Sequence, residues 1–194
     1  PVVCFQEIAG TNQSGFFLTL HNDVVVPYII SYGTEEAKKK YLPGTVNGDC
    51  VTAVAMTEPG AGSDLASMEA TFVEDGDDYI INGNKTFISN GHLSDIVIVA
   101  AKDPNEENPH QAVSLFIVDC DAPGFERGEK FDKMGMHSQD TAEMFFKDVR
   151  VPKENLLGQK GGGFIILMEK LQQERLCAVC GGVCSCRCCL SSSR

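Results

Sequence analysis

The sequence has few basic residues, and it contains no long apolar run. Its 16 lysines and arginines stand against 27 aspartates and glutamates, which gives a formal net charge of −11 at pH 7. Because nucleic acids are polyanions that bind to basic surfaces, this balance argues against a nucleic acid partner. No stretch reaches the roughly 18 consecutive apolar residues of a membrane-spanning helix, so we expect no transmembrane segment. An anionic small ligand is still compatible with the composition, since a few backbone N–H groups and one arginine can bind a phosphate.

The sequence also lacks an initial methionine and any signal or transit pattern. We therefore interpret it as a fragment that begins inside a larger protein. Its 194 residues, 43% of them hydrophobic, are enough for one domain of ordinary size plus additional pieces.

The residue pattern changes from helical to β and back to helical along the chain. In residues 1–48, Thr34 can cap a helix whose acidic first turn and basic later turn suit the helix dipole, and Pro43-Gly44 should end that helix. Residues 49–158 alternate with a period of two. Strands are expected there at residues 51–57, 69–73, 78–81, 85–89, 95–101, 112–118 and 143–146. Helical spacing returns in residues 159–176.

The arrangement of these segments predicts the fold class. Asn82-Gly83, between two of the expected strands, is a signal for a type I′ hairpin turn. The strands follow one another without intervening helices. The sequence therefore predicts an α+β protein with an antiparallel β-barrel or sandwich as its middle domain, flanked by partial α-helical domains. Residues 177–194 form a separate, atypical tail.

Residues 55–64, AMTEPGAGSD, close an apolar stretch with a proline, two glycines and a serine. Pro59 fixes one φ angle, whereas Gly60 and Gly62 accept positive φ and allow another molecule to approach closely. Successive N–H groups in such a turn can bind an anion, and the Ser63 hydroxyl adds a donor. The alternative is a tight hairpin turn without a ligand. A dinucleotide fingerprint is excluded because its third glycine and its following amphipathic helix are missing.

A second segment, KTFISNG, follows at residues 85–91. Together, MTEPGAGSD and KTFISNG strongly resemble the flavin-binding middle domain of acyl-CoA dehydrogenases. QDTAE at residues 139–143 and QERL at residues 173–176 resemble the long-chain branch of that family. The resemblance extends from about residue 14 to residue 176 and stops at Cys177.

The resemblance implies FAD as the cofactor. Backbone around Val54, Met56 and Thr57, together with the Thr57 hydroxyl, would hold the flavin ring. Gly62 and Ser63 would face the FAD diphosphate or the CoA thioester arm.

The segment Phe87-Ile88-Ser89 is also assigned to the cofactor by the resemblance. The Phe87 ring would lie against the isoalloxazine face, and Ser89 would offer a hydrogen bond near flavin N5. Most members of the family that the chain resembles have Trp where this chain has Phe87, and Thr where it has Ser89. Without the motif, Phe87 reads as a core aromatic residue, and Lys85 reads as a solvated charge at a strand edge.

The resemblance further implies a catalytic base for the removal of a proton from Cα and a hydride from Cβ of a fatty acyl-CoA. In the long-chain and isovaleryl branches the base lies on the first helix after the β-domain, and the matching residue here is Glu174. An apolar pocket would raise its pKa toward neutrality. By charge pattern alone, Glu174-Arg175 is an exposed helical charge pair. The other substrate contacts implied are Ser63, His110, Gln111, Gln172, Gln173 and Arg175.

The tail holds six of the nine cysteines, between Cys177 and Cys189. Gly181-Gly182 and the serine run should break the helix there. A thiolate metal site is one interpretation, since Cys177-x-x-Cys180 offers two ligands, but the spacing fits no common zinc module and we assign no metal. The other interpretation is a non-native ending without a selected function.

The resemblance therefore predicts an FAD-dependent acyl-CoA dehydrogenase, in truncated form, that produces a trans-2-enoyl-CoA and passes electrons to an electron-transfer flavoprotein. The parent would be a homotetramer in the mitochondrial matrix of a eukaryote or in the cytoplasm of a bacterium. Two alternatives stay open. One is an acyl-CoA oxidase, which would pass the electrons to oxygen, and the other is a non-catalytic remnant or cysteine-rich metal binder.

Overall fold

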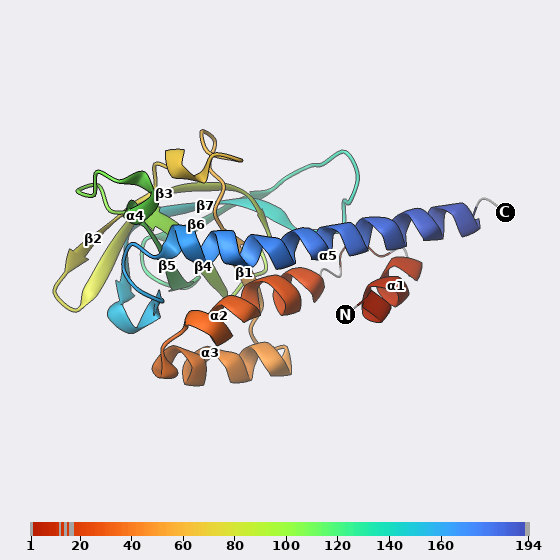
Figure 1. The fold of residues 1–194 in the computed structure, drawn as a ribbon, viewed down its shortest axis with the longest axis horizontal. Helices are drawn as coiled ribbons and strands as arrows, with labels where there is room; N and C mark the ends of the chain where they lie inside the picture. The colour runs from red at the N-terminus through yellow and green to blue at the C-terminus, as the bar shows by residue number, and fades with distance from the viewer. Residues whose placement is uncertain (1, 12, 14, 16–17, 193–194) are drawn as a thin grey trace.

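The computed structural model of the chain describes every residue except 1, 12, 14, 16–17 and 193–194. The predicted start of the family resemblance at residue 14 and the last two residues of the predicted tail lie outside the described residues. Helices cover one side of a sheet, and the longest helix runs across it (Figure 1). The helical elements are α1 (Val2–Gly10), the π-helical turn η1 (Leu20–Val25), α2 (Val26–Tyr32), α3 (Glu35–Asn47), the 3₁₀ turn η2 (Leu65–Ser67), α4 (Pro109–Ala112), the 3₁₀ turn η3 (Lys153–Asn155) and α5 (Gly163–Ser192).

The strands belong to one sheet in the order β6-β7-β3-β2-β4-β5-β8, and β1 pairs with β4 beside this path. Their bounds are β1 (Thr52–Ala55), β2 (Thr71–Asp75), β3 (Asp78–Ser89), β4 (Ile96–Lys102), β5 (Val113–Asp119), β6 (Phe125–Lys130), β7 (Thr141–Pro152) and β8 (Leu156–Leu157). The α+β prediction is confirmed, but the sheet is not closed into a barrel, because β6 and β8 remain as its edges. Most neighbours are antiparallel, whereas β1 and β2 both pair with β4 in the parallel direction.

The hairpin turn lies at a different place from the one predicted. The turn between β2 and β3 uses Gly76, with φ +64°, and Asp77. Asn82-Gly83 lies inside β3, at an irregularity in its pairing with β7. A Cβ on Gly83 would approach the Cα of Ala70 to 2.7 Å, so this glycine allows close backbone approach rather than a turn. The predicted strands 78–81 and 85–89 are consequently one long strand.

The helix after Thr34 confirms the predicted cap but not the predicted end. Thr34 Oγ1 accepts a hydrogen bond from the Ala37 N–H at 3.1 Å. Pro43 lies inside α3, and the helix ends at Gly48, which has φ +84°. A glycine in the left-handed region is the usual end of a helix, since it adopts positive φ without a steric penalty. Pro43-Gly44 therefore does not stop this helix.

Two hydrophobic clusters form on opposite faces of β4 and β5. Alternate residues of a strand point to opposite faces, so Ile96, Ile98 and Ala100 face the helices while Val97 and Val99 face the other side. Tyr28 and Ile29 of α2, Tyr41 of α3 and Leu167 of α5 complete the cluster on the helical side. The first half of α5 is thereby fixed to the sheet.

The second half of α5 corrects the predicted break at Gly181-Gly182. The helix continues through both glycines to Ser192 and contacts α1, which lies beside it beyond the sheet in Figure 1. Each glycine costs about 1 kcal/mol of helix stability relative to alanine, which is too little to end a helix that packs against a neighbour. The domain boundaries at residues 48, 158 and 176 stay predictions. Within the described part of the chain, none of the helices has the length and apolarity that crossing a membrane requires.

Candidate active site

The two segments that carried the family resemblance lie together in the structure. β1 ends at Ala55 and β3 ends at Ser89, and the residues after β1 run alongside the end of β3. The Thr86 N–H donates to Thr57 O at 2.9 Å, and Thr57 Oγ1 donates to Thr86 O at 2.5 Å. We call residues 54–63 and 85–89 the β-platform.

A buried ion pair holds the β-platform together. Lys85 is fully buried, and its Nζ donates to Glu58 Oε1 at 2.7 Å and to Met56 O at 3.1 Å. Glu58 also accepts the backbone N–H groups of Glu69 at 2.6 Å and Ala70 at 3.0 Å. Burial would raise the pKa of Glu58, but the Lys85 ammonium and these two N–H groups outweigh it and lower that pKa. The prediction that Lys85 is a solvated strand-edge charge is therefore wrong.

Phe87 is exposed rather than part of the core. Its side chain is 69% exposed, and its ring centroid lies 5.4 Å from that of Phe131. Its φ of +57° is a strained conformation for a bulky residue and is found chiefly where function requires it. Ile88 is buried in the core on the opposite face, so only its backbone can contact a ligand on the Phe87 side. Ser89 is half-buried, and its hydroxyl has no hydrogen-bond partner among the described residues.

The turn after β1 leaves donors and space at the surface. Glu58 and Ala61 exchange backbone hydrogen bonds of 2.8 and 3.1 Å, which closes the turn. A Cβ built on Gly60 or Gly62 would meet no atom within 4 Å. Within the described chain, the N–H groups of Gly62 and Ser63 and the Ser63 hydroxyl make no hydrogen bond. Free donors in open space, on the same β-platform as an exposed aromatic ring, fit an aromatic cofactor with a phosphate-bearing arm, as the FAD prediction requires.

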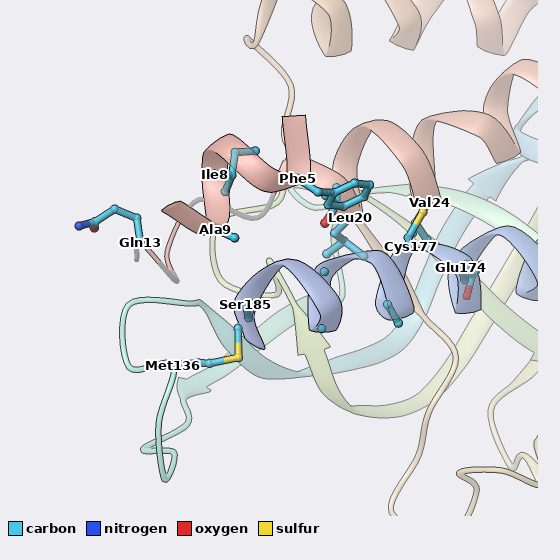
Figure 2. A pocket seen from close by; sticks show the side chains of 14 residues that line it. Phe5, Ile8, Ala9, Gln13, Leu20, Val24, Met136, Glu174, Cys177 and Ser185 are labelled. Carbon is cyan, nitrogen blue, oxygen red and sulfur yellow. The ribbon is translucent and has the colours of Figure 1, made fainter. Parts of the chain in front are cut away.

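A cavity of about 580 Å³ lies between α1, η1 and α5 (Figure 2). Apolar and small side chains dominate its wall, and Glu174 supplies its carboxylate. The full lining is Phe5, Ile8, Ala9, Gln13, Thr19, Leu20, Val24, Met136, Glu174, Cys177, Ala178, Gly181, Gly182 and Ser185. The α5 members recur at intervals of three and four residues, which places them on one face of the helix. The segment predicted to be an irregular tail thus forms one wall of the cavity.

Glu174 is half-buried at this cavity, so it is not the exposed charge pair that its neighbour Arg175 suggested. Its Oε1 accepts a hydrogen bond from the Tyr28 hydroxyl at 2.7 Å. Burial raises the pKa of the Glu174 carboxyl, and the Tyr28 hydrogen bond and the Arg175 guanidinium act in the opposite direction. Arg175 itself is exposed. A carboxyl with a raised pKa in an apolar cavity has the character of a general base.

The other predicted substrate residues do not line the cavity. Gln172 is exposed, and Gln173 Nε2 donates to Asp23 O in η1 at 2.8 Å. His110 and Gln111 are exposed on α4. The ring of His110 packs at 4.4 Å from the ring of Phe164.

Sequence reasoning missed Tyr28 and every cavity residue except Glu174. The available signal for Tyr28 was a polar-tipped aromatic residue in the apolar run of residues 24–30, since a buried tyrosine hydroxyl usually has a partner. No local pattern marks Phe5, Leu20 or Met136 as neighbours of α5. Among the described residues, no three His, Cys, Asp or Glu side chains form a group that could hold a metal ion.

The π-helical turn η1 lies between the cavity and β1, the strand that leads into the β-platform. It contacts both β1 and α5. His21 Nδ1 forms a hydrogen bond of 3.0 Å with Thr52 Oγ1 of β1, and Asp23 O accepts a hydrogen bond from Gln173 Nε2 of α5. π-helical turns occur frequently at functional sites, because their irregular backbone frees carbonyl groups for such contacts.

Comparison with known proteins agrees with this arrangement. The family model "Acyl-CoA dehydrogenase, middle domain" matches residues 53–149, and "Acyl-CoA dehydrogenase, N-terminal domain" matches residues 1–49. The mitochondrial long-chain specific acyl-CoA dehydrogenase of Mus musculus is 49% identical over 175 residues, which are 90% of this chain and 41% of that protein.

Solved structures cover more of the chain. An acyl-CoA dehydrogenase from Geobacillus kaustophilus superposes with a TM-score of 0.95 at 53% identity and covers 98% of this chain, so the match includes most of the tail. A structure described as an electron transferring flavoprotein of Acidaminococcus fermentans has a TM-score of 0.91 at 38% identity, again over 98% of this chain. This chain spans 50% of each of those two chains.

An open sheet covered on one side by helices, with a carboxylate-bearing cavity beside the longest of them, is the α+β fold that the chain shares with these solved structures. The two family models, which match residues 1–49 and 53–149, specify the family. The chain belongs to the acyl-CoA dehydrogenase family.

Proposed function

We propose that this chain forms the flavin-binding and base-bearing part of an FAD-dependent acyl-CoA dehydrogenase that acts on long-chain fatty acyl-CoA. The observation that carries the proposal is the Glu174 carboxylate, half-buried at an apolar cavity of about 580 Å³. An apolar cavity of this size suits a fatty acyl chain, and a bound chain would exclude water from the carboxylate. The similarity to the long-chain specific acyl-CoA dehydrogenase of Mus musculus supports the substrate class.

In this proposal Glu174 withdraws the proton from Cα of the acyl thioester. The raised pKa that burial gives the carboxyl makes it a stronger base than an exposed glutamate. Tyr28 occupies Oε1, so Oε2 is the oxygen that faces the substrate. The cavity walls from α1 and η1 hold the chain against α5, which fixes Cα near the carboxylate.

The β-platform is the proposed site of FAD. Backbone at Val54, Met56, Thr57 and Ile88 would hold the flavin ring, with Phe87 against its face and Ser89 at its edge. When bound, FAD supplies the acceptor for the hydride that leaves Cβ as trans-2-enoyl-CoA forms. The free N–H groups of Gly62 and Ser63 would bind the diphosphate or the CoA arm.

The remaining assignments concern parts of the reaction outside the cavity. Because Gln172, Arg175, His110 and Gln111 are exposed, they are proposed to contact the CoA portion rather than the acyl chain. Gln173 is proposed to act through its hydrogen bond to η1. Electrons would pass to an electron-transfer flavoprotein, a homotetramer is the proposed assembly, and the compartment would be the mitochondrial matrix or the bacterial cytoplasm.

The test is the visible absorbance of the purified chain after incubation with FAD and gel filtration. The proposal predicts a retained flavin band that an anaerobic addition of palmitoyl-CoA bleaches. A retained band that no acyl-CoA bleaches, across short and long acyl chains, would contradict the proposed activity of this chain. Absence of the band would contradict the proposed FAD site.

A further inference from the structure

Among the described residues, the Glu174 carboxylate has one hydrogen-bond partner, and this partner comes from the other end of the chain. Tyr28 of α2 is fully buried, and its hydroxyl lies 2.7 Å from Glu174 Oε1. We propose that Tyr28 is a positioning residue, which fixes Oε1 of Glu174 so that Oε2 is presented to the substrate and the carboxylate stays ionised in its apolar cavity. The inference rests on the proposed function in that it takes Glu174 as the base.

The first support is the rigidity of Tyr28. Its ring packs in the cluster between the helices and the sheet, next to residues such as Ile29 and Ile98 that are themselves fully buried. A ring held in a close-packed interior has little freedom to move its hydroxyl. Within the described residues, Glu174 Oε2 makes no hydrogen bond, so Tyr28 binds one carboxylate oxygen and leaves the other available.

The second support is the set of contacts that keep α5 against α2 and η1. Lys170 Nζ donates to Ser31 Oγ at 2.8 Å, and Gln173 donates to Asp23 O at 2.8 Å. The Tyr32 hydroxyl donates to Glu169, which lies five residues before Glu174 on α5. Tyr28 and Tyr32 therefore make the same type of contact to the same helix, but only the Tyr28 contact reaches a residue of the cavity.

The third support is electrostatic, and it depends on the titratable groups around Glu174. These are Tyr28 from α2 and Arg175 and Cys177 from α5. Tyr32 of α2 acts on Tyr28, and Asp23 of η1 acts on Cys177. The cavity residues from α1 and from the loop after β6 are Phe5, Ile8, Ala9 and Met136, none of which titrates.

Burial dominates this environment and favours the protonated carboxyl. The Tyr28 hydroxyl and the Arg175 guanidinium oppose that effect, and only Tyr28 is itself buried. A hydrogen bond donated to a carboxylate favours its ionised form. Loss of the Tyr28 hydroxyl therefore raises the pKa of Glu174, and a protonated carboxyl cannot accept the Cα proton.

The test is a pH titration of the full chain, labelled with carbon-13 at the glutamate side-chain carboxyls and observed by NMR under reducing conditions. Glu174→Gln identifies the signal of Glu174. In Tyr28→Phe, the midpoint of this signal is expected to rise by about one pH unit, a tenfold change in proton affinity, as a charge-assisted hydrogen bond implies. Tyr32→Phe is the matched control and should leave the midpoint unchanged. An unchanged or lowered midpoint in Tyr28→Phe would overturn the proposal.

A second measurement on the unsubstituted chain decides the matter if Tyr28→Phe does not fold. With carbon-13 at tyrosine Cζ, the Tyr28 signal should shift as Glu174 titrates and with the same midpoint, while the Tyr32 signal should not follow that midpoint. A Tyr28 signal that ignores the titration would refute the contact.

Neither measurement needs FAD or substrate. If the Tyr28 and Glu174 signals share a midpoint but acyl-CoA does not bleach the flavin, the result counts against the proposed function alone. If the flavin is bleached but the two signals do not share a midpoint, the result counts against the role of Tyr28 alone. In the FAD-loaded chain, Tyr28→Phe should also move the acid limb of the kcat–pH profile upward by about one unit without a matching change in KM.

Discussion

The β-platform and the cavity are two halves of one candidate site, and they are built differently. The β-platform consists of short motif segments held by a buried ion pair and by backbone hydrogen bonds. The cavity is lined mainly by helices from both ends of the chain and depends on one face of α5 (Figures 1 and 2). The comparison shows that local motifs can specify a surface such as the β-platform, whereas a cavity between helices needs elements that only the fold brings together.

The largest expected effect is a loss of activity in the cavity that leaves the β-platform unchanged. Glu174→Gln should slow flavin bleaching by palmitoyl-CoA by roughly 10²–10⁴-fold, because the amide cannot accept the Cα proton. Flavin retention should be unchanged, since Glu174 makes no described contact with the β-platform. Stopped-flow absorbance measures the rate, and Glu169→Gln on the same helix should bleach normally. Equal rates in both variants would remove Glu174 from the mechanism.

The next effect tests the β-platform. Lys85→Met leaves the buried Glu58 carboxylate without its cation, and loss of one partner of a buried pair costs roughly 3–5 kcal/mol of unfolding free energy. Urea denaturation measures this value, and flavin retention should decrease with it. Lys153→Met breaks only the exposed contact to Glu74 and should change stability by less than about 0.5 kcal/mol. Similar stability of the two variants would show that the buried pair does not hold the β-platform.

A smaller effect concerns the depth of the cavity. A Leu side chain in Gly181→Leu would enter the cavity, because no atom lies within 4 Å of a Cβ at this position. We expect about tenfold weaker use of palmitoyl-CoA, with less effect on butyryl-CoA, as for pockets that lose room for methylene groups. Steady-state kcat/KM for acyl-CoA of increasing length measures this.

Val179→Leu is the control for Gly181→Leu, because Val179 is 61% exposed on α5 and lies outside the cavity wall. It should leave kcat/KM unchanged for acyl-CoA of every length. If Gly181→Leu also leaves these values unchanged, the acyl group does not lie along this wall.

The smallest effect is a pH dependence of stability. Burial raises the folded pKa of Glu174, so the stability that this carboxyl contributes is present below its unfolded pKa and is lost as the pH rises through the folded pKa. Glu174→Gln avoids this loss and should have a higher Tm than the unsubstituted chain at neutral pH. The difference should disappear near about pH 4, where the unfolded glutamate also becomes protonated. Glu126→Gln changes an exposed glutamate and should give the same Tm as the unsubstituted chain at each pH. If the Tm of Glu174→Gln also equals that of the unsubstituted chain at each pH, the burial of Glu174 is contradicted.

The sequence predicted the β-platform better than the cavity for physical reasons. Turn chemistry and strand alternation are local, so the Thr57 and Phe87 segments were both found and do lie together. The burial of Lys85 was missed because its partner Glu58 is distant in sequence and a lone lysine is usually solvated. The turn was misplaced at Asn82-Gly83 because a glycine needed for close approach to Ala70 has the same sequence signal as a turn glycine.

The cavity was missed because its residues are individually ordinary. Glu174 was found through the family resemblance, but its partner Tyr28 lies 146 residues away. Gly181-Gly182 looked like a helix break, since propensity ignores the contact of α5 with α1 that stabilises the helix. Small side chains on one face of α5 interrupt the hydrophobic periodicity of a helix, and these same side chains leave room for the cavity.

A crystal structure of the chain with FAD and a non-reactive long-chain acyl-CoA analogue tests the central claim most directly. Our account predicts the flavin ring against Phe87, the acyl chain along the Gly181-Gly182 wall, and the substrate Cα within hydrogen-bond reach of Glu174 Oε2 while Tyr28 keeps Oε1. An acyl chain bound outside the α1–η1–α5 cavity, or a Glu174 carboxylate turned away from Cα, would contradict it.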